Sequence, residues 1–153
     1  MIKSANKPSY ILSVLGNKCP RCRRGKLFKT PNAYHFANGR YMQMNEKCPV
    51  CNQPTEIEIG FYYGTGYVSY AITVAFSAAT FVAWWILIGI SINDNRIFWW
   101  LGINTVLLIA LQPVFMRLSR SLWISWFVKF DPDWQNHEAK KPERIVEGQM
   151  GNW

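Results

Sequence analysis

Two long stretches without charge dominate the middle of the chain. No Asp, Glu, Lys or Arg occurs from Ile59 to Asn93, a run of 35 residues, and none occurs from Ile97 to Met116, a run of 20 residues. The hydrocarbon core of a bilayer is about 30 Å thick and is crossed by about 20 helical residues. The pattern therefore predicts two membrane-spanning helices, over residues 67–92 and 97–116.

Only residues 93–96 connect the two predicted spans, which indicates a helical hairpin with both chain ends on one side. Ten of the seventeen Lys and Arg residues precede the hairpin, six follow it and one lies in the connection. The positive-inside rule then places both termini in the cytoplasm, at a bacterial inner membrane. Two buried helices of a soluble protein are the alternative, which is disfavoured because no third apolar element could cover them.

Composition agrees with a membrane protein of about one domain. The 153 residues are 50% hydrophobic and 16% aromatic, with eight Trp, which excludes a disordered chain. Aromatic rings with a polar edge favour the headgroup layers of a bilayer, so membrane lipid is an expected partner. The expected interfacial anchors lie near the ends of the predicted spans and beyond the second one: Tyr67, Trp84, Trp85, Trp99, Trp100, Trp123 and Trp126.

The segment after the second span mixes basic and bulky apolar residues from Arg117 to Phe130. This composition is typical of an interfacial helix lying on the inner leaflet, or of a continuation of the span. The sequence thus divides into residues 1–60, a hairpin over residues 61–116, and an interfacial helix with a polar cytoplasmic tail over residues 117–153.

All four cysteines lie in the basic N-terminal segment, as two Cys-Pro-x-Cys pairs separated by 25 residues. Two such turns aim four sulfurs at one point, which predicts a tetrahedral metal site. Disulfides are disfavoured in a reducing cytoplasm, and a redox Cys-x-x-Cys is disfavoured because two copies occur without a βαβ pattern. Zinc is the expected cofactor, while iron of the rubredoxin type stays open. The predicted ligands are Cys19, Cys22, Cys48 and Cys51.

The segment between the cysteine pairs carries turn and strand signals. Asn38-Gly39 is typical of a hairpin turn, and residues 41–44 alternate in polarity. We therefore expect a small β zinc ribbon, folded largely by its metal because so little of the segment is apolar. The predicted fold class is this ribbon, followed by an α-helical transmembrane hairpin of two spans and an interfacial helix. His35 is a weaker candidate ligand, since four cysteines already complete the site.

Small and hydroxyl residues recur at helical spacing in the first span. Such residues let helices approach closely and share hydrogen bonds, so they predict packing against another helix, although membrane composition alone is an alternative. Neither span contains Asp, Glu, Lys, Arg or His, which argues against a proton or ion pathway. The candidate partner-helix residues are Ser69, Thr73 and Ser77 on one face, Ala71, Ala75 and Ala79 on the other, and Asn104 in the second span.

A basic cluster lies on and after the first cysteine pair. Positive charge there offsets four thiolates and agrees with the predicted topology, and it also suits anionic lipid headgroups. Nucleic acid is a disfavoured partner because the chain has a predicted membrane anchor and because no exposed aromatic residues are expected among the cations of the cluster. The members of the cluster are Arg21, Arg23, Arg24, Lys26 and Lys29.

No catalytic motif accompanies these features. The sequence holds two histidines and has no G-x-S-x-G, P-loop or H-E-x-x-H pattern. A non-enzymatic protein without a small-molecule substrate is therefore expected.

The motifs together resemble a known family. Cys19-Pro-Arg-Cys-Arg-Arg-Gly-Lys-Leu-Phe28, then Cys48-Pro-Val-Cys51, then two spans, is similar to the bacterial domain of unknown function numbered nine hundred and eighty-three. The resemblance covers residues 15–130, and residues 60–70 resemble one subgroup's entry to its first span. It implies a small zinc-ribbon protein of the inner membrane without an established activity, whose genes often lie near those for cytochrome oxidase and its assembly.

The expected function is that of a non-catalytic accessory or assembly subunit of a larger bacterial inner-membrane complex, for which a respiratory complex is one candidate. The spans would then dock on helices of other inner-membrane subunits. A rubredoxin-like iron protein that transfers electrons, and a membrane-anchored regulator that binds nucleic acid, are the alternatives.

Overall fold

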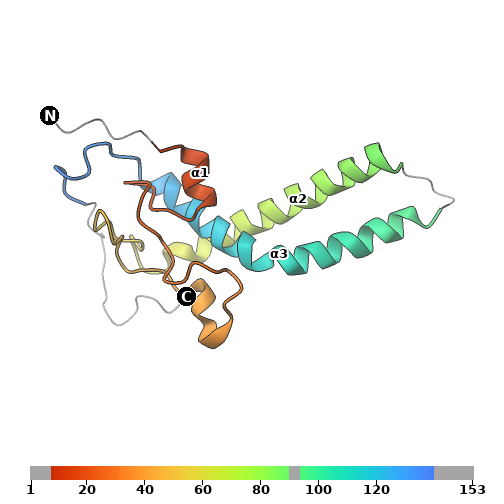
Figure 1. Cartoon of the computed structure of the whole chain (residues 1–153), viewed down its shortest axis with the longest axis horizontal. Coiled ribbons are helices and arrows are strands. Elements are labelled where there is room, and N and C mark those ends of the chain that lie inside the picture. Colours follow the sequence, from red (N-terminus) through yellow and green to blue (C-terminus); the bar gives the residue numbers. More distant parts are fainter. Residues whose placement is uncertain (1–7, 90–93, 140–153) are drawn as a thin grey trace.

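The computed structural model describes residues 8–89 and 94–139. A head formed by both ends of this part of the chain stands at the base of a long helical hairpin (Figure 1). The elements in order are α1 (Tyr10–Leu15), the 3₁₀ helix η1 (Ala37–Met42), the 3₁₀ helix η2 (Phe61–Gly64), α2 (Thr65–Leu87) and α3 (Arg96–Phe127).

The antiparallel helices α2 and α3 form the hairpin. At 1.5 Å per residue, the 23 residues of α2 extend about 35 Å, which is enough to cross a bilayer. Two stretches, Phe61–Leu87 and Arg96–Phe127, are long and apolar enough to be membrane spans, each with a mean hydropathy of 1.7. In the most apolar part of the first stretch, none of the residues is buried by the rest of the described chain, and in that of the second stretch 11% are buried. A core helix of a soluble protein is mostly buried instead.

Polar and aromatic contacts join α2 to α3. Asn104 is buried on α3, where its amide nitrogen donates to the hydroxyl of Ser77 (3.3 Å) and its amide oxygen accepts from Thr80 (3.1 Å). The rings of Phe76 and Phe115 pack with centroids 5.4 Å apart. Hydrogen bonds between spanning helices stabilise their association by roughly 0.6–1.7 kcal/mol each.

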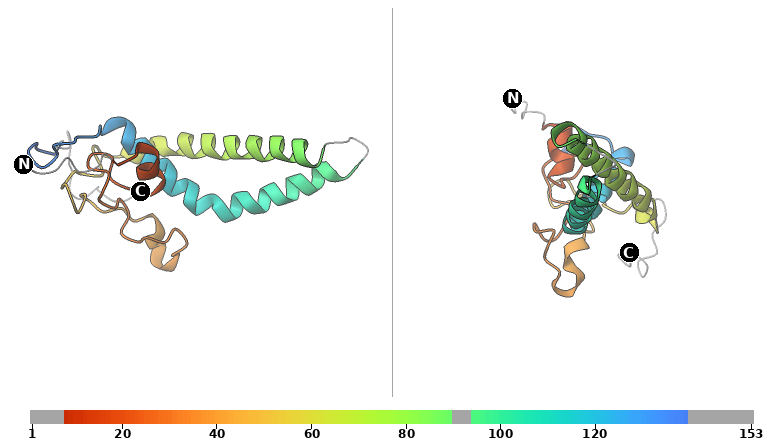
Figure 2. Two further views of the ribbon diagram at one scale, coloured as in Figure 1. Left: turned by 45° about the horizontal axis from the view of Figure 1, so that its top comes forward. Right: turned by 90° about the vertical axis from the view of Figure 1, so that its right-hand side faces the viewer.

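The helix α3 is one continuous element from Arg96 to Phe127, so the residues expected in an interfacial helix extend the second span. It bends part-way along (Figure 2), and Pro113 within it removes one backbone N–H from the helical ladder. Its last turns enter the head, where Ser119, Ser121 and Ile124 are each at most 2% exposed.

The prediction of a β zinc ribbon is wrong for the part of the chain that the structure describes. Only isolated antiparallel bridges occur there, namely Lys18 with Lys26, Phe28 with Met44, and Lys47 with Pro54. Asn38-Gly39 falls inside η1 rather than in a two-residue hairpin turn. The backbone carbonyls of Thr30, before η1, and of Tyr41, within it, accept hydrogen bonds from Arg117 of α3. A side chain, not a partner strand, therefore satisfies them.

Candidate metal centre

The four cysteine sulfurs converge in the head. All four side chains are buried, and their sulfurs lie within 4.8 Å of one another. The Sγ atoms of Cys19 and Cys51 are 3.7 Å apart, as are those of Cys22 and Cys48. Four sulfurs about 2.3 Å from a central zinc ion would be about 3.8 Å apart, whereas a disulfide bond is about 2.0 Å long. The residues therefore fit a tetrahedral metal ion and are not paired as disulfides.

Each cysteine pair lies on a tight turn of the backbone. In the first, the N–H of Arg23 donates to the carbonyl of Cys19 (2.7 Å), and in the second that of Asn52 donates to the carbonyl of Cys48 (3.0 Å). Arg23 and Asn52 both have positive φ, +55° and +56°. The two turns thus repeat one conformation in which the residue after the second cysteine is left-handed, although neither position is glycine.

Hydrogen bonds among the four thiols shift their pKa values in opposite directions. Hydrogen bonds with Cys22, Cys48 and Cys51 raise the pKa of Cys19. The thiol of Cys19 in turn lowers the pKa of Cys22, and it lowers that of Cys48 to about 6. Binding of a divalent ion to such a set displaces the remaining protons, because the thiolate is the ligand.

An apolar core surrounds the sulfurs and connects them to the hairpin. Leu27 and Phe28 from the N-terminal segment, Phe61 of η2, and Ile124 of α3 belong to one buried cluster with the cysteines. The indole N–H of Trp123 donates to the carbonyl of Phe61 (2.7 Å). A metal ion at this site would therefore stabilise the base of both long helices as well as the cysteine turns.

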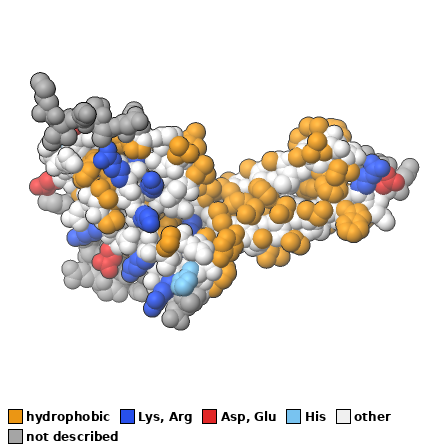
Figure 3. Space-filling model, viewed as in Figure 1, with side chains coloured by type: hydrophobic (Ala, Val, Ile, Leu, Met, Phe, Trp, Pro, Cys, Tyr) orange, Lys and Arg blue, Asp and Glu red, His pale blue; other side chains and the backbone are white. Residues whose placement is uncertain are grey.

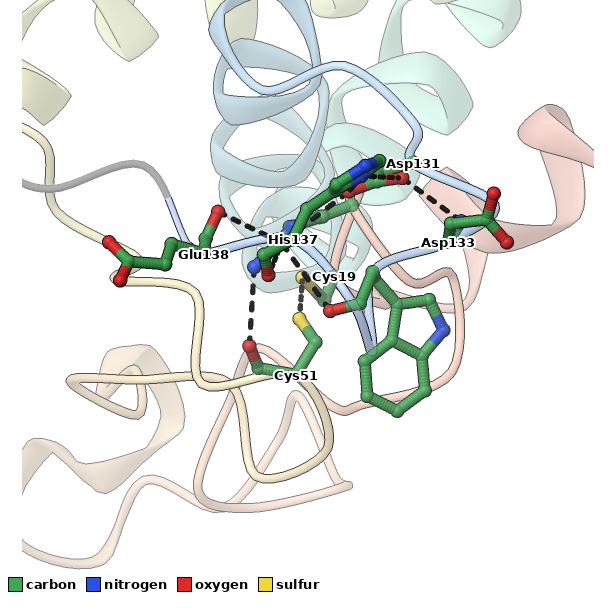
Figure 4. A network of polar contacts seen from close by, with 8 residues as sticks. Cys19, Cys51, Asp131, Asp133, His137 and Glu138 are labelled. Carbon is green, nitrogen blue, oxygen red and sulfur yellow. Dashed lines mark hydrogen bonds and ion pairs between the residues drawn. The ribbon is translucent and has the colours of Figure 1, made fainter.

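Arg21, inside the first cysteine pair, joins the segment after α3 to this centre. Figure 4 shows that segment, with Asp131, His137 and Glu138, beside Cys19 and Cys51. Its side chain is 5% exposed and donates to the carbonyls of Cys51 (3.4 Å), His137 (2.6 Å) and Glu138 (3.0 Å). It also forms an ion pair with Asp131 (3.4 Å), whose backbone N–H donates to the carbonyl of Arg21 (3.1 Å). Hydrogen bonds from a charged group each stabilise by roughly 1.5–3 kcal/mol, so this side chain holds residues 131–138 onto the head.

Gly25 allows the sulfurs to come together. A Cβ atom at this position would lie 2.2 Å from the Sγ of Cys48. We expect Gly25→Ala to displace that sulfur and to weaken metal binding by roughly 10–100-fold, as changes around metal ligands do. Competition with a chromophoric chelator measures this affinity in the purified protein.

Gly102→Ala is the matched control, because a Cβ atom there meets no atom within 4 Å. The control is expected to bind metal like the parent chain. Equal affinity in both variants would contradict the close approach at Gly25.

The other sequence-predicted residues are distributed along the hairpin. Ser77 meets Asn104, whereas Thr73 donates to the carbonyl of Tyr70 (2.8 Å) on its own helix and Ser69 is half-buried. The three alanines of the opposite face are exposed: Ala71, Ala75 and Ala79.

The expected interfacial anchors fall into two groups. Trp123 packs in the head against Phe61, while Trp84 and Trp100 are half-buried in the hairpin. The other expected anchors have exposed side chains on α2 and α3, namely Tyr67, Trp85, Trp99 and Trp126.

Sequence reasoning missed the roles of Arg21 and Arg117. Arg21 was interpreted as compensation for the thiolates and Arg117 as part of a basic interfacial segment, but both side chains are buried, 5% and 2% exposed. The acidic pair Asp131 and Asp133 after α3 was the available signal for the first, because Asp131 supplies its ion pair. Part of the polar tail expected at the end of residues 117–153 is held on the head, because Arg21 donates to the carbonyls of Trp134 (3.4 Å), His137 and Glu138. Residues 140–153 lie outside the described part.

The geometry defines a head with a four-cysteine site that could hold a metal ion, on two candidate membrane spans. No family model, curated protein or solved structure matches the chain. The resemblance to the bacterial family therefore stays a prediction.

Proposed function

We propose that this chain is a non-catalytic accessory or assembly subunit of a larger bacterial inner-membrane complex, of respiratory type. In this proposal the four cysteines hold a structural zinc ion, both termini are cytoplasmic, and the chain belongs to the family that its motifs resemble. The head then forms a rigid cytoplasmic surface, while the hairpin docks on helices of other subunits.

The distribution of charge supports a membrane location. Lys and Arg side chains lie on the head and at the tip of the hairpin, and hydrophobic side chains cover its length (Figure 3). At the tip, Arg96 forms an exposed ion pair with Asp94 (3.3 Å) and donates to the carbonyl of Ile88 (2.9 Å). Such a distribution favours a head on the cytoplasmic side.

The observation that carries the proposal is the division of α2 into two faces. Ser77 and Thr80 bond to Asn104 of the same chain, so the polar face of α2 is used within the hairpin. Ala71, Ala75 and Ala79 stay exposed on the other face. A face of small residues on a membrane helix lets the backbone of a second helix approach closely, which supports docking to another subunit.

A bulky side chain on this face should break the docking. We expect Ala75→Trp to reduce the partner subunits that co-purify in mild detergent by roughly tenfold, which is about 1.4 kcal/mol of lost packing, while metal content is unchanged. Quantitative mass spectrometry of the affinity-purified chain from native membranes measures both partner recovery and identity.

Tyr70→Trp is the control, because it exchanges one exposed aromatic residue for another elsewhere on α2. It should retain its partners. Purification of the parent chain as a bare monomer would contradict the proposal.

A further inference from the structure

A loop of the head extends along the hairpin and carries exposed aromatic side chains. We call residues 29–42, which include η1, the foot loop. Tyr34 is 47% exposed and Phe36 is 58% exposed. Their rings pack edge to face with centroids 6.3 Å apart, and Phe36 also packs on Tyr41 at 5.3 Å. The exposed rings therefore form one cluster.

Arg117 of α3 fixes this loop in place. Its Nε donates to the carbonyl of Tyr41 (2.7 Å). One terminal nitrogen donates to the carbonyls of Thr30 (3.0 Å) and Pro31 (3.3 Å), and the other to the hydroxyl of Thr30 (2.8 Å) and the carbonyl of Asn32 (2.9 Å). All five guanidinium N–H groups therefore donate hydrogen bonds to the foot loop, which fixes the position of its aromatic cluster relative to α3.

The loop reaches the part of α3 that lacks charge. The hydroxyl of Tyr34 donates to the carbonyl of Ala110 (2.9 Å), which lies within the uncharged run over residues 97–116. The exposed rings are therefore continuous with the apolar surface of the hairpin. The short helix α1 lies on the opposite side of the hairpin base (Figures 1 and 2). It has three exposed apolar side chains, those of Ile11, Leu12 and Leu15.

The charge around the foot loop has one sign. The foot loop contains Lys29 and Arg40 and no Asp or Glu. The backbone N–H of Lys29 donates to the carbonyl of Gln43 (3.0 Å), and the hydroxyl of Thr30 donates to the carbonyl of Arg40 (3.3 Å). The two cationic residues, Lys29 and Arg40, therefore lie where the two ends of the foot loop come together. Cations beside a membrane attract anionic lipid by about 1 kcal/mol each.

We propose that the foot loop is a second membrane contact of the head, seated in the headgroup layer of an anionic bilayer. Tyr34 and Phe36 enter the boundary between headgroups and acyl chains, while Lys29 and Arg40 face lipid phosphates. Aromatic rings with adjacent cations have this preference at interfaces. The inference rests on the hairpin crossing the membrane, and it adds that the head is fixed against the bilayer rather than free above it.

Photocrosslinking of the full-length chain tests the inference. Phe36→p-benzoyl-phenylalanine is reconstituted in vesicles of phosphatidylcholine and phosphatidylglycerol, irradiated, and analysed for lipid adducts by mass spectrometry. Tyr34→p-benzoyl-phenylalanine gives a second position in the cluster. Val50→p-benzoyl-phenylalanine is the control, because Val50 is 42% exposed on the second cysteine turn. We expect several-fold more lipid adduct at positions 34 and 36 than at position 50.

A probe at Val82 of α2, which is 47% exposed, separates this inference from the hairpin itself. Lipid adduct at position 82 without adduct at 34 or 36 overturns the foot loop contact and leaves the membrane hairpin intact. Adduct at none of the three overturns both. Crosslinking of positions 34 and 36 to protein alone overturns the lipid contact in favour of a protein partner.

Discussion

Cys19→Ser is expected to abolish tight metal binding and to unfold the head, while α2 and α3 stay inserted. A structural four-thiolate zinc site contributes about 10–16 kcal/mol to the folding of small domains, and a chain of this size has about 5–15 kcal/mol of stability in total. Loss of one ligand therefore removes most of what holds the cysteine turns together. Metal analysis and amide hydrogen exchange of the protein in detergent check the prediction.

The exchange pattern should follow the core around the sulfurs. Because Ile124 of α3 and Phe61 of η2 pack in this core, protection should fall at the base of both helices as well as in the head. Val50→Ser is the control, since it changes an exposed residue between the two cysteines of the second turn. Loss of membrane insertion in Cys19→Ser would show that head and hairpin are not separable in this way.

Arg117→Met is expected to release the foot loop without loss of the metal. Methionine keeps the apolar first part of the side chain but lacks the guanidinium group, whose carbon lies 4.7 Å from the ring centroid of Phe28. It removes every hydrogen bond from α3 to the carbonyls of Thr30, Pro31, Asn32 and Tyr41. The loss amounts to about 3 kcal/mol, or roughly a hundredfold faster amide exchange at Lys29 and Gln43.

Arg40→Met is the matched control for charge, because the Arg40 side chain is exposed. Exchange at the same two amides should be close to that of the parent chain. If Arg117→Met leaves that exchange unchanged, the loop is held by something other than this guanidinium.

Local patterns in the sequence located the main features of the molecule. The cysteine spacing predicted a four-sulfur site, and the sulfurs of Cys19, Cys22, Cys48 and Cys51 do meet, because a Cys-x-x-Cys turn fixes two sulfurs by local geometry alone. The uncharged runs located two long apolar helices for a similar reason, since hydropathy is summed residue by residue. Whether zinc occupies the site stays a prediction.

The prediction of strands was wrong because it rested on local turn and alternation patterns, whereas the contact that stabilises this segment comes from a residue distant in sequence. Asn38-Gly39 suits a hairpin turn, but η1 forms there and the carbonyls of Thr30 and Tyr41 bond to Arg117, at least 76 residues away. A tertiary contact of this strength overrides a weak local preference. The role of Arg21 could not be predicted for the same reason. One of its hydrogen-bond acceptors, the carbonyl of His137, lies 116 residues later in the sequence.

The positive charge of the chain acquires a more specific meaning from these contacts. The sequence carries a net charge of +8, and its arginines were interpreted as topology and thiolate compensation. Arg21 and Arg117 instead join segments distant in sequence, one at the metal centre and one at the foot loop. Arginine suits this role because its planar fork donates to several carbonyls at once.

The presence of a structural zinc ion is tested by the metal content of the chain, purified from native membranes in mild detergent without added metal. We expect one zinc per chain, retained on dialysis and lost in Cys19→Ser. One iron per chain with a visible thiolate-to-metal absorption band would contradict the structural role and favour electron transfer. A folded chain with no tightly bound metal would contradict the metal centre itself.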